Sequence, residues 1–346
     1  KVQKTSPFKY LGLKIEEQTV VPRTIKINDN PKTLQKLHQL CESINWVRQL
    51  LGLTTEDLAP LFNLLCGNED LKSLRQLTEE ARNSLIKVQE ALSSRQAHCY
   101  APGLPFQFIV LGKMPYRHGL VFQWDKVQRD PLLIIEWVFL SHQPSKSITT
   151  PQELMAQLVI KARSRLRTFA GCDFTCVYLP LTTNALDHLL QNNNHLQFAF
   201  DTYSGQISAH NQKHKLFNSA FKLIPKEIQS REPLNALTIF TDGSGASHKS
   251  VMTQKWESDV QVVEGSPQVA ELAAVVRAFE WFNEPFNFVT DSAYVAGVVS
   301  GAERALLREV ANPKIYKLLS KLMQIVSHQK QPFYIMHVRS HTDLLG

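Results

Sequence analysis

The chain has 346 residues, of which 43% are hydrophobic and 20% are charged, and its formal net charge is +7. This much apolar material is enough for well-packed cores, and a prior of about 150 residues per domain predicts two or three domains. No apolar run approaches the ~18 residues that a membrane-spanning helix needs. The composition therefore excludes an integral membrane protein of the helical type and favours a globular one.

The charge is unevenly distributed along the chain. Residues 1–100 hold 14 basic and 11 acidic residues, residues 101–233 hold 14 and 9, and residues 234–346 hold 10 and 11. A basic excess is typical of domains that track a phosphate backbone, whereas an acidic balance suits a pocket for metal ions. We therefore expect nucleic-acid contacts in the first two segments and a cation site in the last.

Residues 31–98 are predicted to form a small helical bundle. Asn30 is a suitable N-cap for a first helix with Pro31 at its first position, and an apolar stripe follows at helical spacing. The stripe consists of Leu34, Leu37, Ile44, Val47 and Leu51. A second amphipathic helix begins after Thr78, which can cap it and is followed by two glutamates.

Residues 99–232 combine strand-like runs with one long helix. The strand-like runs are 106–111, 119–124 and 132–140, separated by turn residues. The helix covers 150–167, with Thr150 as cap and Glu153 completing a capping box. Its basic run consists of Lys161, Arg163, Arg165 and Arg167. Lys161 and Arg163 are candidates for phosphate contact, but residues two apart do not share a helix face, so a solvated helix end is the alternative.

The five cysteines include no C-x-x-C pair and favour a reduced environment over a disulfide framework. Cys172 and Cys176 with His210 and His214 would supply the ligands of a zinc site. The long and irregular gap between the two pairs argues against that interpretation.

Three acidic residues in the last third stand where strands or helices would aim them into a cleft. Asp242 ends an apolar run before a Gly-Ser-Gly turn, Glu271 lies in an apolar helical stretch, and Asp291 ends another apolar run. Each has a simpler interpretation: a turn former, a solvated helix face and a helix N-cap. Their order and spacing favour a single site.

Carboxylates that are brought together repel one another, so a stable cluster implies a cation between them. Oxygen ligands without accompanying Cys or His pairs favour Mg²⁺ or Mn²⁺ over zinc. Two such ions about 3.5–4 Å apart can activate water and stabilise the leaving oxygen of a phosphodiester. The predicted reaction class is metal-assisted phosphodiester hydrolysis.

Four motifs in this region resemble, in order and spacing, the ribonuclease H domain of retroviral reverse transcriptases, most closely those of betaretroviruses and K-type endogenous retroviruses. The motifs are Thr241-Asp-Gly-Ser244, Ala270-Glu-Leu-Ala273, Val289-Thr-Asp-Ser-Ala-Tyr-Val295 and His337-Val-Arg-Ser-His341-Thr. The resemblance implies that Asp242, Glu271 and Asp291 bind two Mg²⁺ or Mn²⁺ ions and that His341 assists proton transfer or product release. It also makes Ser244 and Ser292 candidate nucleic-acid contacts.

Upstream, Tyr10-Leu-Gly-Leu-Lys-Ile15 and Gln18-Thr-Val-Val21 resemble the end of the polymerase palm with its primer-grip hairpin. The resemblance implies a multidomain α/β fold with a helical thumb and two ribonuclease H-like domains. Its parts are a palm tail (1–30), a thumb (31–98), a connection domain without the acidic site (99–232) and an RNase H domain (233–346). In the thumb helix, Gln35, Asn45 and Trp46 are expected to contact the template–primer, with a core position as the alternative for Trp46.

The implied function is to bind an RNA/DNA hybrid and to hydrolyse its RNA strand, within the remainder of a Pol polyprotein. The expected setting is the cytoplasm or the virion, with no membrane segment; dimerisation is left open. The sequence contains no Tyr-x-Asp-Asp motif, so no polymerase site is expected in it.

The family's fourth carboxylate follows the histidine shortly downstream, and the sequence ends at Gly346. We therefore expect an incomplete site, and the alternative function is an inactive nucleic-acid-binding remnant of a retroelement. An actin-like ATPase would need a second Asp-Gly phosphate loop, but Asp291 is followed by Ser292.

Overall fold

The computed structural model describes residues 6–10, 12–22, 30–114, 116–142, 146–220, 228–244, 249–254, 257–303, 305–308 and 310–338. For 219–220, 242–244, 249–254 and 257–262 it describes the backbone alone. The chain divides into two compact units, one of residues 1–142 and 152–224 and one of residues 143–151 and 225–346. Within the described residues, no helix has the length and apolar character needed to cross a membrane.

The first unit begins with an antiparallel sheet of order β1-β2-β3-β4. Its strands are β1 (Phe8–Tyr10), β2 (Leu13–Ile15), β3 (Thr19–Pro22) and β4 (Ala97–His98). The β1–β2 hairpin turns at Gly12, whose φ of +77° lies in the left-handed region that glycine tolerates. Because β4 pairs with β3, this sheet joins the two ends of the helical region that lies between them.

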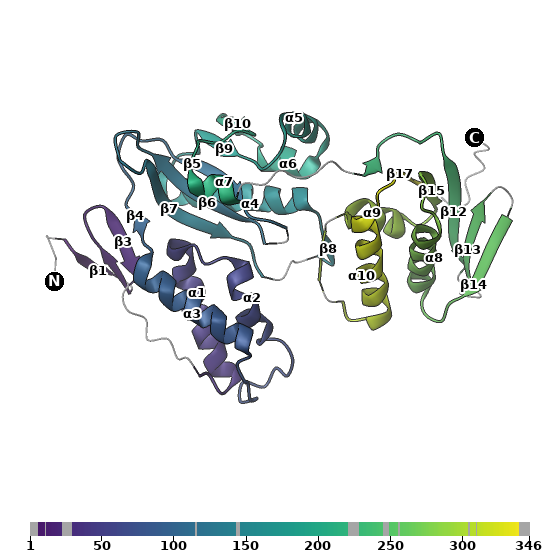
Figure 1. Ribbon diagram of the computed structural model, residues 1–346, viewed down its shortest axis with the longest axis horizontal. Helices are drawn as coiled ribbons and strands as arrows, with labels where there is room; N and C mark the ends of the chain where they lie inside the picture. The colour runs from purple at the N-terminus through teal and green to yellow at the C-terminus, as the bar shows by residue number, and fades with distance from the viewer. Residues whose placement is uncertain are drawn as a thin grey trace. The chain divides into compact units, whose positions relative to one another are not determined.

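The helical region consists of α1 (Leu34–Leu51), α2 (Thr55–Asn63) and α3 (Glu79–Ser94), which pack around a shared apolar core (Figure 1). The predicted stripe of α1 is buried throughout. The prediction of the second cap is confirmed, since the Thr78 hydroxyl accepts a hydrogen bond from the amide of Ala81. The bundle is held by the burial of leucine side chains, each of which contributes about 1.5–3 kcal/mol.

The predicted start of the first helix is wrong. Asn30 does not cap it; the N-cap is Thr33, whose hydroxyl accepts from the amide of Lys36. Residues 33–35 are held instead by the segment around residues 71–74, because the amide of Leu34 donates to Ser73 and that of Gln35 to Leu71. This non-local pairing keeps Pro31 outside the helix.

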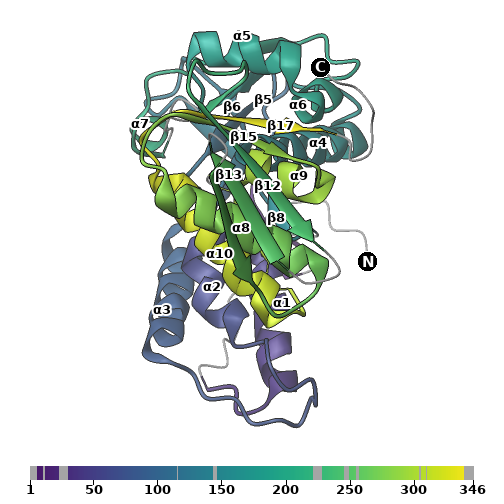
Figure 2. The same cartoon turned by 90° about the vertical axis from the view of Figure 1, so that its right-hand side faces the viewer.

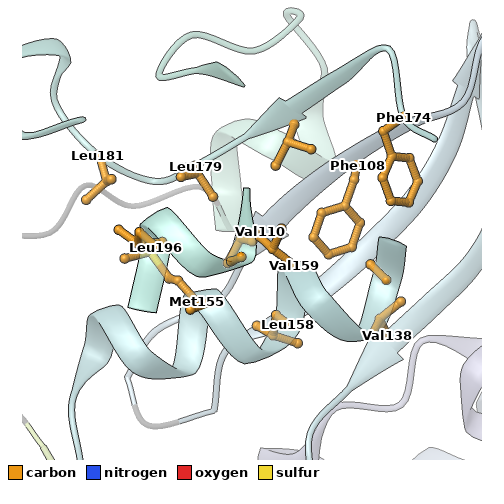
Figure 3. Close-up of a cluster of buried hydrophobic side chains, with 14 of the residues drawn as sticks. Phe108, Val110, Val138, Met155, Leu158, Val159, Phe174, Leu179, Leu181 and Leu196 are labelled. Carbon is orange, nitrogen blue, oxygen red and sulfur yellow. The ribbon is translucent and has the colours of Figure 1, made fainter. Parts of the chain in front are cut away.

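The rest of the first unit is an α/β domain with a five-stranded sheet of order β10-β9-β5-β6-β7. Its strands are β5 (Gln107–Leu111), β6 (His118–Trp124), β7 (Leu132–Phe139), β9 (Cys176–Tyr178) and β10 (Gln206–Ser208). Its helices are α4 (Pro151–Ala170), α5 (Thr183–Asn192), α6 (Asn194–Ala199) and α7 (Lys215–Ala220). One apolar cluster joins α4 to Phe108, Val110 and Val138 of the sheet (Figure 3).

The second unit has a six-stranded sheet of order β11-β17-β15-β12-β13-β14. Its strands are β11 (Gln229–Ser230), β12 (Leu237–Ser244), β13 (Lys249–Gln254), β14 (Glu257–Val262), β15 (Phe286–Thr290) and β17 (Phe333–His337). A two-stranded pair, β8 (Ile148–Thr149) and β16 (Leu306–Leu307), lies beside them. The helices are α8 (Pro267–Trp281), α9 (Ala293–Ala302) and α10 (Pro313–His328). Figure 2 shows α8 against β12 and β13, and α10 packs on α8.

The two large sheets share one strand order. In the first unit, β7, β6 and β5 are antiparallel neighbours and β9 and β10 continue in parallel. In the second unit, β14, β13 and β12 are antiparallel neighbours, and β15 and β17 continue in parallel. The predicted fold class, a helical bundle followed by two similar α/β domains, is confirmed.

Candidate active site

The candidate acidic residues gather at one edge of the second sheet. Thr241 of β12 pairs with Thr290 of β15, which pairs with His337 of β17. Because these strands are parallel, their carboxyl ends meet at the same edge. The backbone of Asp242 follows Thr241, and Asp291 follows Thr290. Two of the three predicted carboxylate positions therefore lie on neighbouring strands at equivalent levels.

Asp291 reaches this edge because a wholly buried strand precedes it. All five residues of β15 are buried, and Phe286 and Phe288 contribute to the apolar core under the sheet. Asn287 is anchored by its side chain, which exchanges hydrogen bonds with the backbone of Leu234. The first exposed position is Asp291, so the chain leaves the core at the carboxylate itself.

Glu271 is brought to the same edge by α8. Its helical neighbours Ala274, Val275 and Ala278 are buried, whereas Glu271 is half-buried. Its Oε2 accepts a hydrogen bond of 2.6 Å from the hydroxyl of Ser292. A half-buried carboxylate needs such a partner, since an unpaired buried charge is costly. The simpler interpretation of a fully solvated helix face does not describe this residue.

Ser292 links the two acidic positions. Its hydroxyl also caps α9 by accepting from the amide of Val295 at 3.3 Å, and its own amide donates to the Thr290 hydroxyl at 3.2 Å. Of the Asp291-Ser292 pair, it is therefore the serine that serves as the helix N-cap. The carboxylate of Asp291 is not needed for the cap and stays exposed at the edge.

Two further residues at this edge were not predicted as site residues. Tyr294 lies in the first turn of α9, and both burial and the charge of Glu271 raise the pKa of its hydroxyl. His337 ends β17, and its Nε2 lies 3.1 Å from the backbone oxygen of Asp291. Tyr294 follows the N-cap Ser292 by two residues, so the sequence could have placed it in the first turn of the helix. His337 is placed only by strand pairing.

The side chains at this edge include the oxygen ligands that a divalent metal ion needs. Glu271 and Asp291 supply carboxylate oxygens, the ligands that Mg²⁺ and Mn²⁺ prefer. Among the side chains that the structure describes, no three His, Cys, Asp or Glu residues form a metal-binding group; the side chain of Asp242 is not among them. Ser244 lies on β12 with its backbone alone described, and His341 lies outside the described residues.

The predicted contacts of the thumb lie on the solvent side of α1. Gln35, Asn45 and Trp46 are all exposed, and Trp46 is 46% exposed, so its alternative as a core residue is wrong. A Cβ placed on Gly12 would lie 3.5 Å from the Trp46 ring. The tip of the β1–β2 hairpin therefore packs beside this indole.

The basic run of α4 is largely engaged within the protein. Arg163 is only 5% exposed, and it bonds Asp173 as well as the backbone oxygens of Ala199 and Asp201. Its predicted role in phosphate contact is therefore not carried further, because a buried and fully engaged guanidinium cannot reach a duplex. Lys161 is exposed, and its ammonium donates to the backbone oxygen of Phe139.

Family models match three parts of the chain. A reverse transcriptase thumb domain matches residues 22–86, an ERVK-8-like, RNaseH-like domain matches residues 117–217, and RNase H matches residues 234–346. The first model covers the helical bundle, and the other two cover the α/β domains with the shared strand order. The second of these domains holds the acidic edge.

Among known proteins, the chain is similar to retroviral polyproteins. It is 33% identical over 351 residues to the Gag-Pro-Pol polyprotein of Mouse mammary tumor virus (strain BR6) and 32% identical over 355 residues to that of Squirrel monkey retrovirus. It is 31% identical over 355 residues to that of Mason-Pfizer monkey virus. Each match covers 100% of this chain and 19% of the polyprotein. The chain spans about a fifth of the length of these relatives, and the betaretroviral resemblance of its motifs is confirmed.

Proposed function

We propose that this chain is an RNA/DNA hybrid ribonuclease. It carries a reverse transcriptase thumb domain, an RNase H-like domain and an RNase H domain of the betaretroviral type. It hydrolyses the RNA strand at the edge formed by Asp242, Glu271 and Asp291. The observation that carries this proposal is the convergence of Glu271 with the Asp291-Ser292 segment beside the end of β12.

The site residues divide the work between binding and positioning. Asp242, Glu271 and Asp291 would hold two divalent ions, Mg²⁺ or Mn²⁺, which when bound supply an activated water and neutralise charge on the phosphate. Ser292 orients the Glu271 carboxylate, and His337 restrains the backbone of Asp291. His341 remains the proposed residue for proton transfer or product release.

The proposed hybrid-binding surface is formed mainly by uncharged side chains. Gln35 and Asn45 offer amide donors and acceptors, and Trp46 offers a flat apolar ring beside the β1–β2 hairpin. Such groups suit the shallow minor groove of an A-like duplex, where base edges and 2′-hydroxyls are exposed. Ser244 and Ser292 are proposed sugar–phosphate contacts at the cleavage site, and Lys161 is a weaker candidate because its ammonium is already bonded.

In this proposal the partners are the RNA/DNA hybrid and the remainder of a Pol polyprotein, in the cytoplasm or a virion. A second copy of the chain is a further proposed partner. These assignments rest on the domains that the chain shares with its relatives.

The test is cleavage of a hybrid whose RNA strand carries a 5′ fluorophore, in the presence of Mg²⁺. We expect cleavage of the RNA in the hybrid but not in an RNA/RNA duplex, and its loss in Asp242→Asn. Binding of the hybrid, followed by fluorescence anisotropy, should persist in that variant. Binding without any cleavage by the unmodified chain would reject the nuclease and favour the inactive nucleic-acid-binding remnant.

A further inference from the structure

Arg117 of the connection domain is a buried cation with no counterion among the residues that the structure describes. The residue is 6% exposed, and its Nε and Nη1 atoms are buried without a hydrogen-bond partner among the described residues. Burial alone lowers its pKa, to about 10, with no carboxylate acting in the opposite direction. An uncompensated buried charge costs several kcal/mol, so such a group normally has an anionic partner.

The surroundings of Arg117 are positive as well as apolar. Burial lowers the pKa of the imidazole of the next residue, His118, and the nearby Arg48 and Arg117 lower it further. The carboxylate that acts on His118 is that of Asp57, which already bonds the Lys87 ammonium at 2.8 Å. The charge at this end of β6 is therefore not balanced by the described side chains that act on it.

The position of Arg117 in the sheet corresponds to the acidic edge of the other α/β domain. Leu111 at the end of β5 pairs with His118, so Arg117 lies one step beyond this pair, where β5 and its parallel neighbour β9 end. In the second unit the same edge, just beyond the paired Thr241 and Thr290, carries Asp242 and Asp291. The shared strand order thus places a buried cation in one domain where the other has carboxylates.

Arg117 directly precedes β6, a strand with apolar side chains on both faces of the sheet. Val121 belongs to the apolar cluster that includes Val110, Met155 and Leu158 (Figure 3). Leu120 and Phe122 belong to a second apolar cluster. An apolar wall strengthens electrostatic attraction to an anion, because the local dielectric is low.

We propose that Arg117 forms a binding site for a small free oxyanion of the phosphate or sulfate class, at the edge of the connection domain that corresponds to the candidate active site. The guanidinium group suits oxyanions because its N–H donors match their oxygens. A free anion is the source of choice, since a side chain that is 6% exposed leaves no room for a nucleic-acid backbone. This site is independent of hybrid cleavage.

The experiment uses the full chain with inorganic phosphate as the probe, in a ³¹P NMR titration against a chloride buffer of equal ionic strength and pH. The phosphate resonance should broaden with the unmodified chain and not with Arg117→Met. Arg129→Met, at an exposed arginine of the β6–β7 turn, is the matched control and should broaden it as the unmodified chain does. Equal broadening with Arg117→Met would overturn the proposal.

Thermal unfolding supplies a second readout. Phosphate should raise the unfolding midpoint of the unmodified chain and of Arg129→Met by at least about 2 °C, with no rise for Arg117→Met. In chloride, Arg117→Met should unfold at or above the midpoint of the unmodified chain, because it removes an uncompensated charge. A much lower midpoint in chloride would instead show a structural role and overturn the proposal.

Two additions cover the remaining outcomes. Arg117→Lys is the conservative variant and should give a phosphate response weaker than that of the unmodified chain, because lysine keeps the charge with a poorer donor geometry. An equal response would count against the site. A duplex oligonucleotide at the same phosphate concentration separates the sources: a response to the duplex alone, lost in Arg117→Met, would reject the free anion.

Discussion

The two α/β domains have the same strand order and opposite chemistry at the same edge. In the RNase H domain, β15 ends at an exposed aspartate and α8 brings Glu271 beside it. In the α/β domain of the first unit, β5 is followed by Gly112 and β9 by Leu179, and the buried Arg117 stands directly before β6. The scaffold therefore defines where a site is formed, and a few strand-end residues decide which charge it holds.

If the two scaffolds are equally well packed, replacing a core phenylalanine by alanine should lower the free energy of unfolding by the same amount in each domain. Phe108 and Phe279 are both buried beneath their sheets, and Phe→Ala substitutions in cores cost about 3–5 kcal/mol. We expect Phe108→Ala and Phe279→Ala each to lower the free energy of unfolding by that amount in urea titrations.

Phe198→Ala is the control for these two variants. This ring is 71% exposed on α6, so the change should stay within about 0.5 kcal/mol. A large loss in one domain and a small loss in the other would show that the two cores are not equivalent, despite their common strand order.

Replacing an aspartate should have different effects on hybrid cleavage in the two domains, whereas the core substitutions should have equal effects on stability. Asp291→Asn removes a proposed metal ligand and should lower hybrid cleavage by at least about 100-fold, since even the outer partners of metal ligands change affinity or activity by 10–100-fold. Cleavage is measured on a labelled hybrid in Mg²⁺. Asp187→Asn, at an exposed carboxylate of the α/β domain in the first unit, should leave the rate unchanged. An equal loss in both variants would remove Asp291 from the site.

The sequence predicted the features that depend on local spacing. The stripe on α1, the Thr78 cap and the position of Asp291 after β15 all follow from residues a few positions apart. The predicted end of a strand at Asp242 is wrong, because β12 continues to Ser244 in pairing with β13. Features that depend on distant partners were missed. The start of α1 is decided by residues 71–74, and the burial of Arg163 is decided by Asp173, which lies beyond the end of α4.

The candidate site shows the same division. The order and spacing of Asp242, Glu271 and Asp291 predicted a single site, and the structure brings Glu271 beside the Asp291-Ser292 segment. The hydrogen bond between Ser292 and Glu271 could not be predicted, because it joins a helix to the loop after a different strand. His337 reaches Asp291 only through the parallel pairing of β15 and β17.

The Ser292 hydroxyl should have a smaller effect than a metal ligand, because it acts through Glu271. Ser292→Ala removes the bond to Glu271 and should lower cleavage about 10-fold and raise the Mg²⁺ concentration needed for half-maximal rate. Ser292→Thr, which keeps a hydroxyl, should restore both.

The same substitution also removes the N-cap of α9, which is worth about 1 kcal/mol. Asn312→Ala separates the two effects, because Asn312 caps a different helix, α10, through the amides of Lys314 and Ile315. It should lower stability similarly without changing the Mg²⁺ dependence. If both variants shift the Mg²⁺ dependence equally, Ser292 acts through stability and does not position Glu271.

The smallest expected effect is a loss of stability at acidic pH, caused by two histidines of the first unit. Burial and the nearby Arg48 lower the pKa of His118 and of His142. Both imidazoles therefore bind protons less readily in the folded chain than in the unfolded chain, where the pKa is about 6.5. Their contribution to stability is complete above that value and is lost as the pH falls below it.

The urea midpoint of the unmodified chain should accordingly decline between pH 7 and pH values below about 6. His118→Phe should flatten this decline, because the phenyl ring can keep the aromatic packing on Trp137 and Phe139 without accepting a proton. His328→Phe changes an exposed histidine of the second unit and should leave the slope as it is. If the urea midpoint falls with pH equally in all three proteins, His118 is not the origin of the acid sensitivity.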